Sequence, residues 1–303
     1  MEISQLRTFY EIAQAGSYTK ASQKLFISKS AVSHQIKNLE KDLDVKLFQR
    51  QGNRRILTDD GISFAKAVSK FLDELDGLKR FCEDMRDSKT GAITIATSSG
   101  LMLHTIPEIL QRFTSEFPHT RVKFMSRGAS SELVEMVRGN AADLAIGTAS
   151  TPDLPAEVCF LAWREFPRML IARKNHPLSG RKVIRLADIS SLSLILPKHE
   201  TLTTQVIEKS LQQRGLPCDI IIEADSVEIS KKYVQMGFGV AVAPDLSLTR
   251  EEKESLWCHD VSRLFGKARY GIYYRRDKYF TTAMKQFIRV FSTKVYEDFL
   301  SQR

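Results

Sequence analysis

Four polar side chains between residues 28 and 43 have the types and the spacing to contact DNA. At roughly 100° per residue on a helix they fall within an arc of about 100°; they are Ser30, Ser33, His34 and Lys37. Hydroxyl, imidazole and ammonium groups can reach base edges and phosphates from a helix that lies in the major groove. The segment is therefore a candidate recognition helix, and Ser28 is a suitable residue to cap its start.

The elements around this segment would hold it in place. Its opposite face is apolar, with Val32, Ile36, Leu39 and Leu43 within an arc of about 60°. A shorter amphipathic segment, 18–26, precedes it; Ser17 is the expected cap, and the expected buried side chains are Ala21, Leu25 and Phe26. Helices joined this tightly form a helix-turn-helix with the second helix as the reader. A helical hairpin with a merely solvated polar face remains the alternative.

Two further elements complete the predicted N-terminal domain. Residues 4–15 should form a first helix that packs beneath the pair. Two short apolar runs, 45–50 and 56–58, flank a turn at 51–55 and predict a β-hairpin, or wing. Arg54 and Arg55, at its predicted tip, can reach phosphates or an adjacent minor groove. A solvated hairpin tip is the alternative interpretation of these two arginines.

The composition suits a protein with a polyanionic partner, without demanding one. The 303 residues suit two domains, and the net charge is +9. Between residues 20 and 55 there are nine Lys and Arg against three acidic residues, so the charge lies where the helix pair lies. No apolar run of 18 residues and no signal peptide is present, which predicts a cytoplasmic protein. Four cysteines, at 82, 159, 218 and 258, lack metal-ligand spacing; reduced thiols are expected, with a redox switch as the lesser alternative.

A long helix should follow the wing. Thr58 is its expected cap, and Asp59 and Asp60 complement the dipole of its first turn. Apolar residues then alternate at spacings of four and three, which predicts a heptad seam; they are Phe64, Val68, Phe71, Leu75, Leu78, Cys82 and Met85. The same helix of a second subunit is the expected partner of this seam. A long amphipathic core helix is the alternative.

After a helix break at 87–91, strands and helices alternate. The predicted strands are 92–97, 121–126, 142–147, 168–173, 192–196, 218–223 and 239–243, and the predicted helices are 103–117, 130–138, 202–214 and 227–236. Such alternation implies parallel α/β sheets, here in two small lobes. Ligands of such sheets bind beyond the carboxyl ends of the strands, at helix N-termini.

Hydroxyl-bearing and glycine residues gather at those positions. They occupy 97–100, 128–130, 148, 201–204 and 225–226. Hydroxyls and free backbone amides that face one cleft would receive a small, anionic molecule. Each residue alone is explained more simply as a helix cap, but their shared location makes a binding site a competitive hypothesis.

The order of these parts, over essentially the whole chain, resembles that of the LysR-type transcriptional regulator family. In the N-terminal third the resemblance rests on 6–9 (LRTF), 16–22 (GSYTKAS), 28–36 (SKSAVSHQI), 39–40 (LE), 47–50 (LFQR) and 57–61 (LTDDG). Later motifs that match are Pro107, 117–118 (FP), 139–146 (GNAADLAI), 176–178 (HPL) and 237–244 (GFGVAVAP).

The resemblance implies an α/β protein with three parts. These are a winged helix-turn-helix DNA-binding domain at 1–58, a dimerising linker helix at 59–90 and an effector-binding domain at 91–303 similar to periplasmic solute-binding proteins. Lobe I of that domain would comprise 91–161 and 267–303, and lobe II 162–266. The implied partners are double-stranded DNA with a dyad-symmetric operator, a second copy in a homodimer or homotetramer, and RNA polymerase, but no membrane.

The family's functional positions map onto this chain residue by residue. The implied DNA contacts are Thr19, Lys29, Ser30, Ser33, His34, Lys37, Arg50, Arg54 and Arg55. Many members carry Gln-Pro where this chain has Lys29-Ser30, so an amide that reads adenine is replaced here by a point charge. The implied effector contacts are Ser98, Ser99, Gly128, Thr148, Thr201, Thr203 and Ser226. No catalytic residue, metal or cofactor is expected beyond the small-molecule effector.

Two other classes of protein were weighed. A solute-binding protein would explain the α/β part, but the first 90 residues and the lack of a signal peptide count against it. An enzyme would need a catalytic constellation, and the sequence has no GxSxG, HExxH, Walker loop or GxGxxG after a strand. Asp143, at the start of an apolar strand, is expected to act at the strand entry rather than as a catalytic acid.

Overall fold

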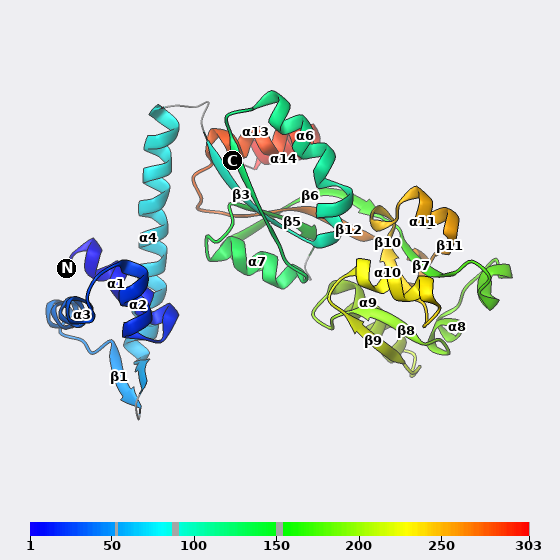
Figure 1. The fold of residues 1–303 in the computed structure, drawn as a ribbon, viewed down its shortest axis with the longest axis horizontal. Helices are drawn as coiled ribbons and strands as arrows, with labels where there is room; N and C mark the ends of the chain where they lie inside the picture. The colour runs from blue at the N-terminus through cyan, green and yellow to red at the C-terminus, as the bar shows by residue number, and fades with distance from the viewer. Residues whose placement is uncertain (52–53, 87–90, 150–153, 303) are drawn as a thin grey trace. The chain divides into compact units, whose positions relative to one another are not determined.

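The computed structural model describes residues 1–51, 54–86, 91–149 and 154–302. These residues form two compact units, Met1–Cys82 and Glu83–Arg303, which Figure 1 draws as ribbons coloured along the chain. No helix among the described residues is both long and apolar enough to span a membrane. The break expected at 87–91 falls mainly on residues outside the described ranges.

The first unit is a winged helix-turn-helix. Its elements are α1 (Ile3–Ala15), α2 (Tyr18–Leu25), α3 (Lys29–Leu43), β1 (Phe48–Gln51), β2 (Arg54–Leu57) and α4 (Asp59–Arg86). The predicted caps are confirmed, since Ser17 accepts from the Lys20 amide and Ser28 accepts from the Ala31 amide at 3.1 Å. The core of the unit includes the predicted apolar face of α3, with Val32, Ile36 and Leu39 buried.

One predicted core residue of α2 is wrong. Phe26, expected on the buried side, is 94% exposed. Helix α2 ends at Leu25, and Phe26 follows as its C-cap in the left-handed conformation with φ of 55°. A residue in that conformation no longer continues the helical face, so its ring turns away from the core.

Helix α4 shares its first turns with this core. Thr58 is its cap, as expected, because its hydroxyl oxygen accepts from the Gly61 amide at 2.9 Å. Only glycine fits at position 61, where a Cβ would lie 2.1 Å from the Leu47 carbonyl oxygen. Phe64 and Val68 pack against residues of α1 and α3 in the same core. The first two positions of the predicted seam therefore contact their own chain, contrary to expectation, because they complete the small core of this unit.

The rest of the seam differs in exposure. Phe71 is 43% and Leu78 58% exposed, and Cys82 is also exposed. Leu75 is half-buried. The side chain of Met85 lies outside the described ones. An apolar surface on α4 thus remains open within the described unit.

The second unit contains two α/β lobes joined by two crossings of the chain. Lobe I is built from β3 (Ala92–Thr97), α5 (Ser99–His104), α6 (Ile106–Glu116), β4 (Arg121–Ser126), α7 (Ser130–Arg138), β5 (Leu144–Thr148), β6 (Val158–Phe166), β12 (Ala268–Arg275), α13 (Thr282–Phe291) and α14 (Thr293–Ser301). Lobe II is built from β7 (Arg168–Arg173), η1 (Pro177–Gly180), α8 (Leu186–Ser190), β8 (Leu194–Pro197), α9 (Leu202–Gln212), β9 (Ile220–Ala224), α10 (Val227–Met236), β10 (Ala241–Pro244), η2 (Asp245–Ser247), α11 (Arg250–Ser255), β11 (Leu256–Asp260) and α12 (Ser262–Phe265).

The two lobes share one strand order. Lobe I has the sheet β4-β3-β5-β12-β6. Lobe II has the pair β8-β9 and the sheet β10-β7-β11, which a parallel bridge between Leu194 and Val240 joins as β9-β8-β10-β7-β11. Strand β7 enters lobe II directly after β6, and β12 returns to lobe I after β11. Each lobe therefore receives one strand from the chain that crosses over.

The prediction of parallel sheets is correct only in part. Strand β3 pairs in parallel with β4 and β5, and β8 pairs in parallel with β9. The crossing strands β7 and β12 pair antiparallel with both of their neighbours. A chain that returns from the other lobe need not take the right-handed helical crossover that gives a parallel pair.

Most other predicted elements match within a few residues. The helix expected at 103–117 is instead two helices, α5 and α6, that meet at Thr105. Pro107, in the first turn of α6, lacks the amide that would continue a preceding helix. Strands β6, β11 and β12 and helices α13 and α14 were not predicted.

Each lobe has its own apolar core. Helix α7 covers one face of the first sheet, and α6, α13 and α14 cover the other, as Figure 1 shows. A buried ion pair fastens β5 in this lobe: Lys278 lies 2.8 Å from Asp143, whose carboxylate also accepts from the Thr94 amide at 2.8 Å. Asp143 thus acts at the entry to the strand, as expected.

Candidate DNA-contacting surface and ligand cavity

The polar face of α3 is open to solvent within the first unit. Lys29, Ser30, His34 and Lys37 are exposed, and Ser33 is half-buried. The Ser30 hydroxyl lies 2.8 Å from that of Ser28, and His34 Nδ1 lies 3.4 Å from the Asn38 amide nitrogen. The structure therefore brings the five predicted residues of this helix onto one accessible face.

The predicted DNA contacts outside α3 lie in two elements, helix α2 and the wing. Thr19 is exposed in the first turn of α2. Arg54 and Arg55 lie in β2, opposite Gln51 and Arg50, rather than at the tip of the hairpin. The position of Arg54 and Arg55 corrects the prediction that they lie at the hairpin tip, because β2 already begins at Arg54. Residues 52–53 lie outside the described ones. The side chains of Arg50 and Arg54 also lie outside the described ones.

Arg55 is fastened to the helix-turn-helix. Its guanidinium carbon lies 5.2 Å from the centre of the Tyr18 ring, within the range of a cation–π contact. Burial raises the pKa of Tyr18, and the positive charge of Arg55 opposes part of that rise. The contact links the second strand of the wing to the start of α2.

A buried carboxylate that sequence reasoning missed connects α3 to the wing. Glu40, 8% exposed, accepts from the backbone amides of Leu47 at 2.9 Å and Phe48 at 3.3 Å. It also lies 3.1 Å from the Lys46 ammonium group. An acidic residue next to a buried leucine, eight residues before the start of β1, was the available signal. Glu40 orients the wing relative to the recognition helix.

In the second unit, all seven predicted effector contacts line one cavity. The cavity volume is about 80 Å³, room for several water molecules or one small molecule. Three of its wall residues, Gly128, Thr201 and Asp225, also line a wider hollow of about 450 Å³. The inner cavity lies between the lobes, since Ser98 and Thr148 come from lobe I and Thr203 and Ser226 from lobe II.

Several of the hydroxyls are engaged at helix N-termini. Ser98 accepts from the Leu101 amide at 3.5 Å, and Ser226 accepts from the Ile229 amide at 3.4 Å. The Thr201 hydroxyl donates to the Lys198 carbonyl oxygen at 2.8 Å. Ser98 and Ser226 thus cap the starts of α5 and α10 at the cavity wall, whereas the Thr201 side chain accepts no backbone amide of α9. The simpler explanation, helix capping, and the location at a cavity both apply.

Other residues also line the cavity. Ser130, at one of the positions expected from the sequence, has its hydroxyl 2.6 Å from that of Thr148. Sequence reasoning missed Leu246 and Ser247 of η2 and Tyr270 of β12. Gly147 also lines the cavity, where a Cβ would lie 2.5 Å from Leu133 Cδ1. Because β12 was not predicted, nothing in the sequence placed Tyr270 there.

Two charged residues near the cavity, Asp225 and Arg168, differ in how they are paired. Asp225 at the wall is paired with Lys198 at 2.6 Å. Burial raises the pKa of Tyr270, and the nearby charge of Arg168 opposes the rise. Arg168 is itself buried, and burial lowers its pKa. Its guanidinium donates to the carbonyl oxygens of Phe265 and Gly266, whereas its Nε has no hydrogen-bond partner among the described residues.

Comparisons with known proteins agree with this architecture. The family model "Bacterial regulatory helix-turn-helix protein, lysR family" matches residues 3–62, and "LysR substrate binding domain" matches 86–295. The chain is 31% identical to the HTH-type transcriptional regulator CysB of Burkholderia cenocepacia over 268 residues, which are 88% of this chain and 85% of that protein.

Two solved structures share the fold. Full-length CbnR, in complex with its target DNA, has a TM-score of 0.62 at 17% identity and covers 97% of this chain and 100% of its own. The effector-binding domain of QuiR, in complex with shikimate, has a TM-score of 0.60 at 17% identity and covers 69% of this chain and 98% of its own. With the two family models and the identity to CysB, the chain belongs to the LysR family of ligand-controlled, DNA-binding transcriptional regulators.

Proposed function

We propose that the cavity between the lobes binds a small anionic effector, and that its occupancy controls how paired copies of the chain engage DNA. The observation that carries the proposal is the gathering of seven hydroxyl and glycine residues from both lobes around one cavity. A ligand that contacts both lobes can bias their arrangement, because it binds one arrangement more tightly than the other.

The anionic character of the ligand rests on helix N-termini. Helices α7, α9 and α10 each begin with residues that line the cavity, namely Ser130, Thr201–Thr203 and Ser226. The unpaired amides and the positive dipole end of a helix N-terminus favour negative charge. The buried cation of Arg168, whose charge acts on Tyr270 at the wall, adds to the same preference.

The proposed activity is binding without chemical conversion. The described lining residues include no His, Cys or Lys, and their one carboxylate, Asp225, is paired with Lys198. A hydroxyl without an adjacent base is a weak nucleophile. We therefore infer that the effector is released without chemical change, so that the protein does not act on it as an enzyme would. We also infer that the regulator uses no small molecule besides this effector.

On the DNA side, α3 is proposed to read the major groove of a dyad-symmetric operator. Lys29, Lys37 and the wing arginines would supply phosphate contacts, and Ser33 and His34 the base contacts. The open surface of α4 at Phe71, Leu75 and Leu78 is proposed to pair two copies into a dimer, and dimers into a tetramer. RNA polymerase in the cytoplasm is the proposed downstream partner. The structure of CbnR, to which this chain is similar, contains the target DNA of that regulator.

A two-part experiment on the full-length protein tests this function. Thermal unfolding is followed with small carboxylates, sulfates and phosphates, and with uncharged analogues of the same size. An anion at about 100 times its dissociation constant adds ~2.7 kcal/mol to the unfolding free energy. Operator binding is then titrated with and without the stabilising anion. Stabilisation by uncharged compounds alone would refute the anionic site, and operator binding that ignores the anion would refute control by the cavity.

A further inference from the structure

A buried lysine organises a polar cluster beside the cavity. Lys231 of α10 is 2% exposed, and its ammonium group lies 2.7 Å from Glu228, 2.9 Å from Glu252 and 2.6 Å from the Ser247 carbonyl oxygen. A lysine has three N–H donors, so these three acceptors satisfy it completely. All four residues belong to lobe II, which can therefore assemble this cluster alone.

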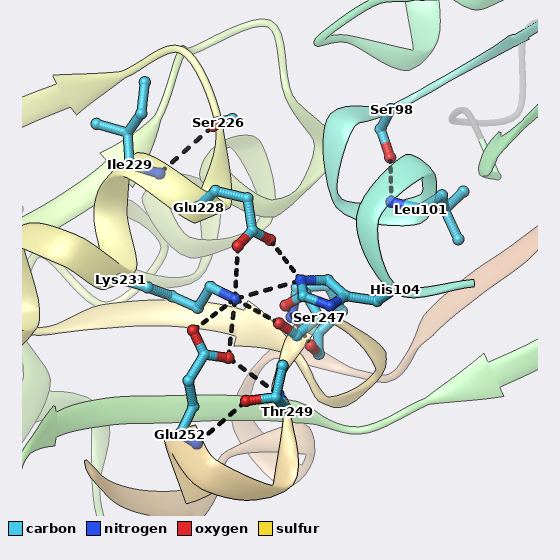
Figure 2. Close-up of polar contacts among 11 residues, drawn as sticks. Ser98, Leu101, His104, Ser226, Glu228, Ile229, Lys231, Ser247, Thr249 and Glu252 are labelled. Carbon is cyan, nitrogen blue, oxygen red and sulfur yellow. Dashed lines mark hydrogen bonds and ion pairs between the residues drawn. The ribbon is translucent and has the colours of Figure 1, made fainter. Parts of the chain in front are cut away.

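One residue of lobe I reaches into the cluster. His104, the last residue of α5, has its Nε2 atom 3.1 Å from Glu228 and 3.5 Å from the Lys231 ammonium nitrogen. Because the donors of Lys231 are already used, the geometry favours an Nε2–H that donates to the free oxygen of Glu228. Figure 2 shows His104 entering from α5, opposite the lysine.

The charges of the cluster make this contact favourable. The cluster has two carboxylates, on Glu228 and Glu252, and one ammonium group, on Lys231. An N–H donor from His104 therefore stabilises the remaining negative charge. The adjacent Asp245 and Lys253 neutralise each other at 2.7 Å. Burial alone would raise the pKa of Glu252, but hydrogen bonds from Thr249 and Lys231 hold the pKa below its ordinary value. Glu252 therefore stays ionised.

The cluster also lies between two walls of the cavity. Helix α5 begins at the cap Ser98 and α10 at the cap Ser226, and both caps line the cavity. Figure 2 shows the two caps on the helices that His104 and Glu228 join. Gly100 in the first turn of α5 lines the cavity as well, and a Cβ there would lie 3.6 Å from Glu228. Breaking the contact would remove a polar link between the two walls.

We propose that His104 and the Glu228–Lys231–Glu252 cluster form an ionic latch that positions lobe I against lobe II and so couples lobe closure to ligand binding. This role rests on the proposed function only in assigning the ligand to the cavity. The latch is complete in the lobe arrangement described here. A ligand that contacts both walls stabilises this same arrangement, so ligand and latch act in the same direction. Loss of the latch must then lower the affinity of the protein for such a ligand.

The first test needs no ligand. Hydrogen–deuterium exchange is measured on the full-length protein, on its His104→Gln and Glu228→Gln variants, and on a His104→Lys variant that supplies an ammonium donor to Glu228. Losing a hydrogen bond to a charged group should speed exchange in α5 and in the first turn of α10 by about ten-fold. His104→Lys should retain the slow exchange of the parent protein.

A matched control removes a histidine that does not join the lobes. His199 lies 2.7 Å from Glu208, and both belong to lobe II. His199→Gln should leave α5 and α10 unchanged. Parent-like exchange in both His104→Gln and Glu228→Gln would overturn the latch. Fast exchange in His104→Lys together with parent-like exchange in Glu228→Gln would also overturn it.

The second test measures coupling with inorganic sulfate as the anion probe. Thermal stabilisation is titrated with sodium sulfate against sodium chloride at equal ionic strength. In His104→Gln the sulfate concentration for half-maximal stabilisation should rise about ten-fold, and His199→Gln should match the parent. An unchanged midpoint in His104→Gln would overturn the coupling. If sulfate does not stabilise the parent protein, the titration is repeated with the carboxylate or phosphate that does. If no anion stabilises it, the anionic site is refuted, while hydrogen exchange still decides whether the latch exists.

Discussion

The two units of this protein present their functional polar groups in opposite ways. On α3 the groups proposed to read DNA are mostly exposed, and their position is set by the buried apolar face behind them. Around the cavity, the hydroxyls of Ser98, Thr201 and Ser226 already make hydrogen bonds to backbone groups of the protein.

This difference predicts how each unit responds to substitution. A residue on the exposed face of α3 can be replaced with little effect on folding, so changes in DNA binding report its contacts directly. A capping residue at the cavity contributes to the start of a helix, where replacement by alanine typically costs ~1 kcal/mol. Stability must therefore be measured together with binding in the second unit.

The largest expected effect is on folding and comes from Glu40, a buried polar residue in the first unit. Glu40→Ala leaves the Leu47 and Phe48 amides without their acceptor and should lower the unfolding free energy of this unit by about 3 kcal/mol. Denaturant unfolding of the full-length protein checks this, because the transition of the second unit should not move. Lys46→Ala removes only the exposed partner of the same carboxylate and should have little effect. Equal effects of the two variants would contradict the role of Glu40.

The next effect concerns the open surface of α4. Leu78→Asp would place a charge in the proposed subunit interface and should weaken self-association about a hundred-fold. Sedimentation velocity measures this directly. Ile62→Asp is the control, since Ile62 is also exposed on α4 but lies outside the heptad seam. A dimer that survives Leu78→Asp would show that the chains pair elsewhere.

A smaller effect separates two kinds of DNA contact within the first unit. Arg55→Ala should weaken binding to all duplexes alike and flatten the salt dependence by about one unit, because it removes a phosphate contact. His34→Ala should instead change base preference, by ~1–3 kcal/mol at one position. Binding-site selection with both variants makes the comparison. Altered base preference in the Arg55 variant alone would reverse the assignment.

The smallest expected effect is the acid response of the second unit. The pKa of Glu252 is lowered in the folded protein, so the stability that it contributes is present above its ordinary pKa of 4.5 and is lost as pH falls below that value. Thermal unfolding between pH 6 and about pH 3 should therefore depend less on pH in Glu252→Gln. Glu251→Gln, an exposed neighbour on α11, should follow the parent curve. Identical curves for all three proteins would exclude this contribution.

The sequence was most informative where local rules decide the structure. Helix α3 was predicted from its apolar period and its Ser28 cap, and the cavity residues from their places after strands. Phe26 was misplaced because the left-handed end of α2 has no strong sequence signal without glycine. Phe64 and Val68, the first two positions of the α4 seam, were wrongly assigned to a second subunit, because the pattern does not reveal which partner buries them.

Contacts between distant segments escaped prediction. Strand β12 and Tyr270 reach the cavity only because the chain returns from lobe II to lobe I. The contact of His104 with Glu228, and those of Lys231 with Ser247 and Glu252, likewise join separate elements, and the sequence pattern does not show that these elements are close. The single-sequence pattern therefore located most of the cavity walls but not the polar groups that hold the walls together.

The central claim, that one unit binds a ligand and the other binds DNA, is tested most directly by Thr203→Ala. Thr203 is buried at the cavity wall in lobe II, and losing its hydrogen bond to a charged ligand should weaken effector binding ten-fold or more. Calorimetry with the anion found by thermal unfolding is compared with operator titration of the same ligand-free variant, and Thr114→Ala on α6 is the control. We expect weaker effector binding with unchanged operator affinity. Unchanged effector affinity in Thr203→Ala would contradict the assignment of the effector to this cavity.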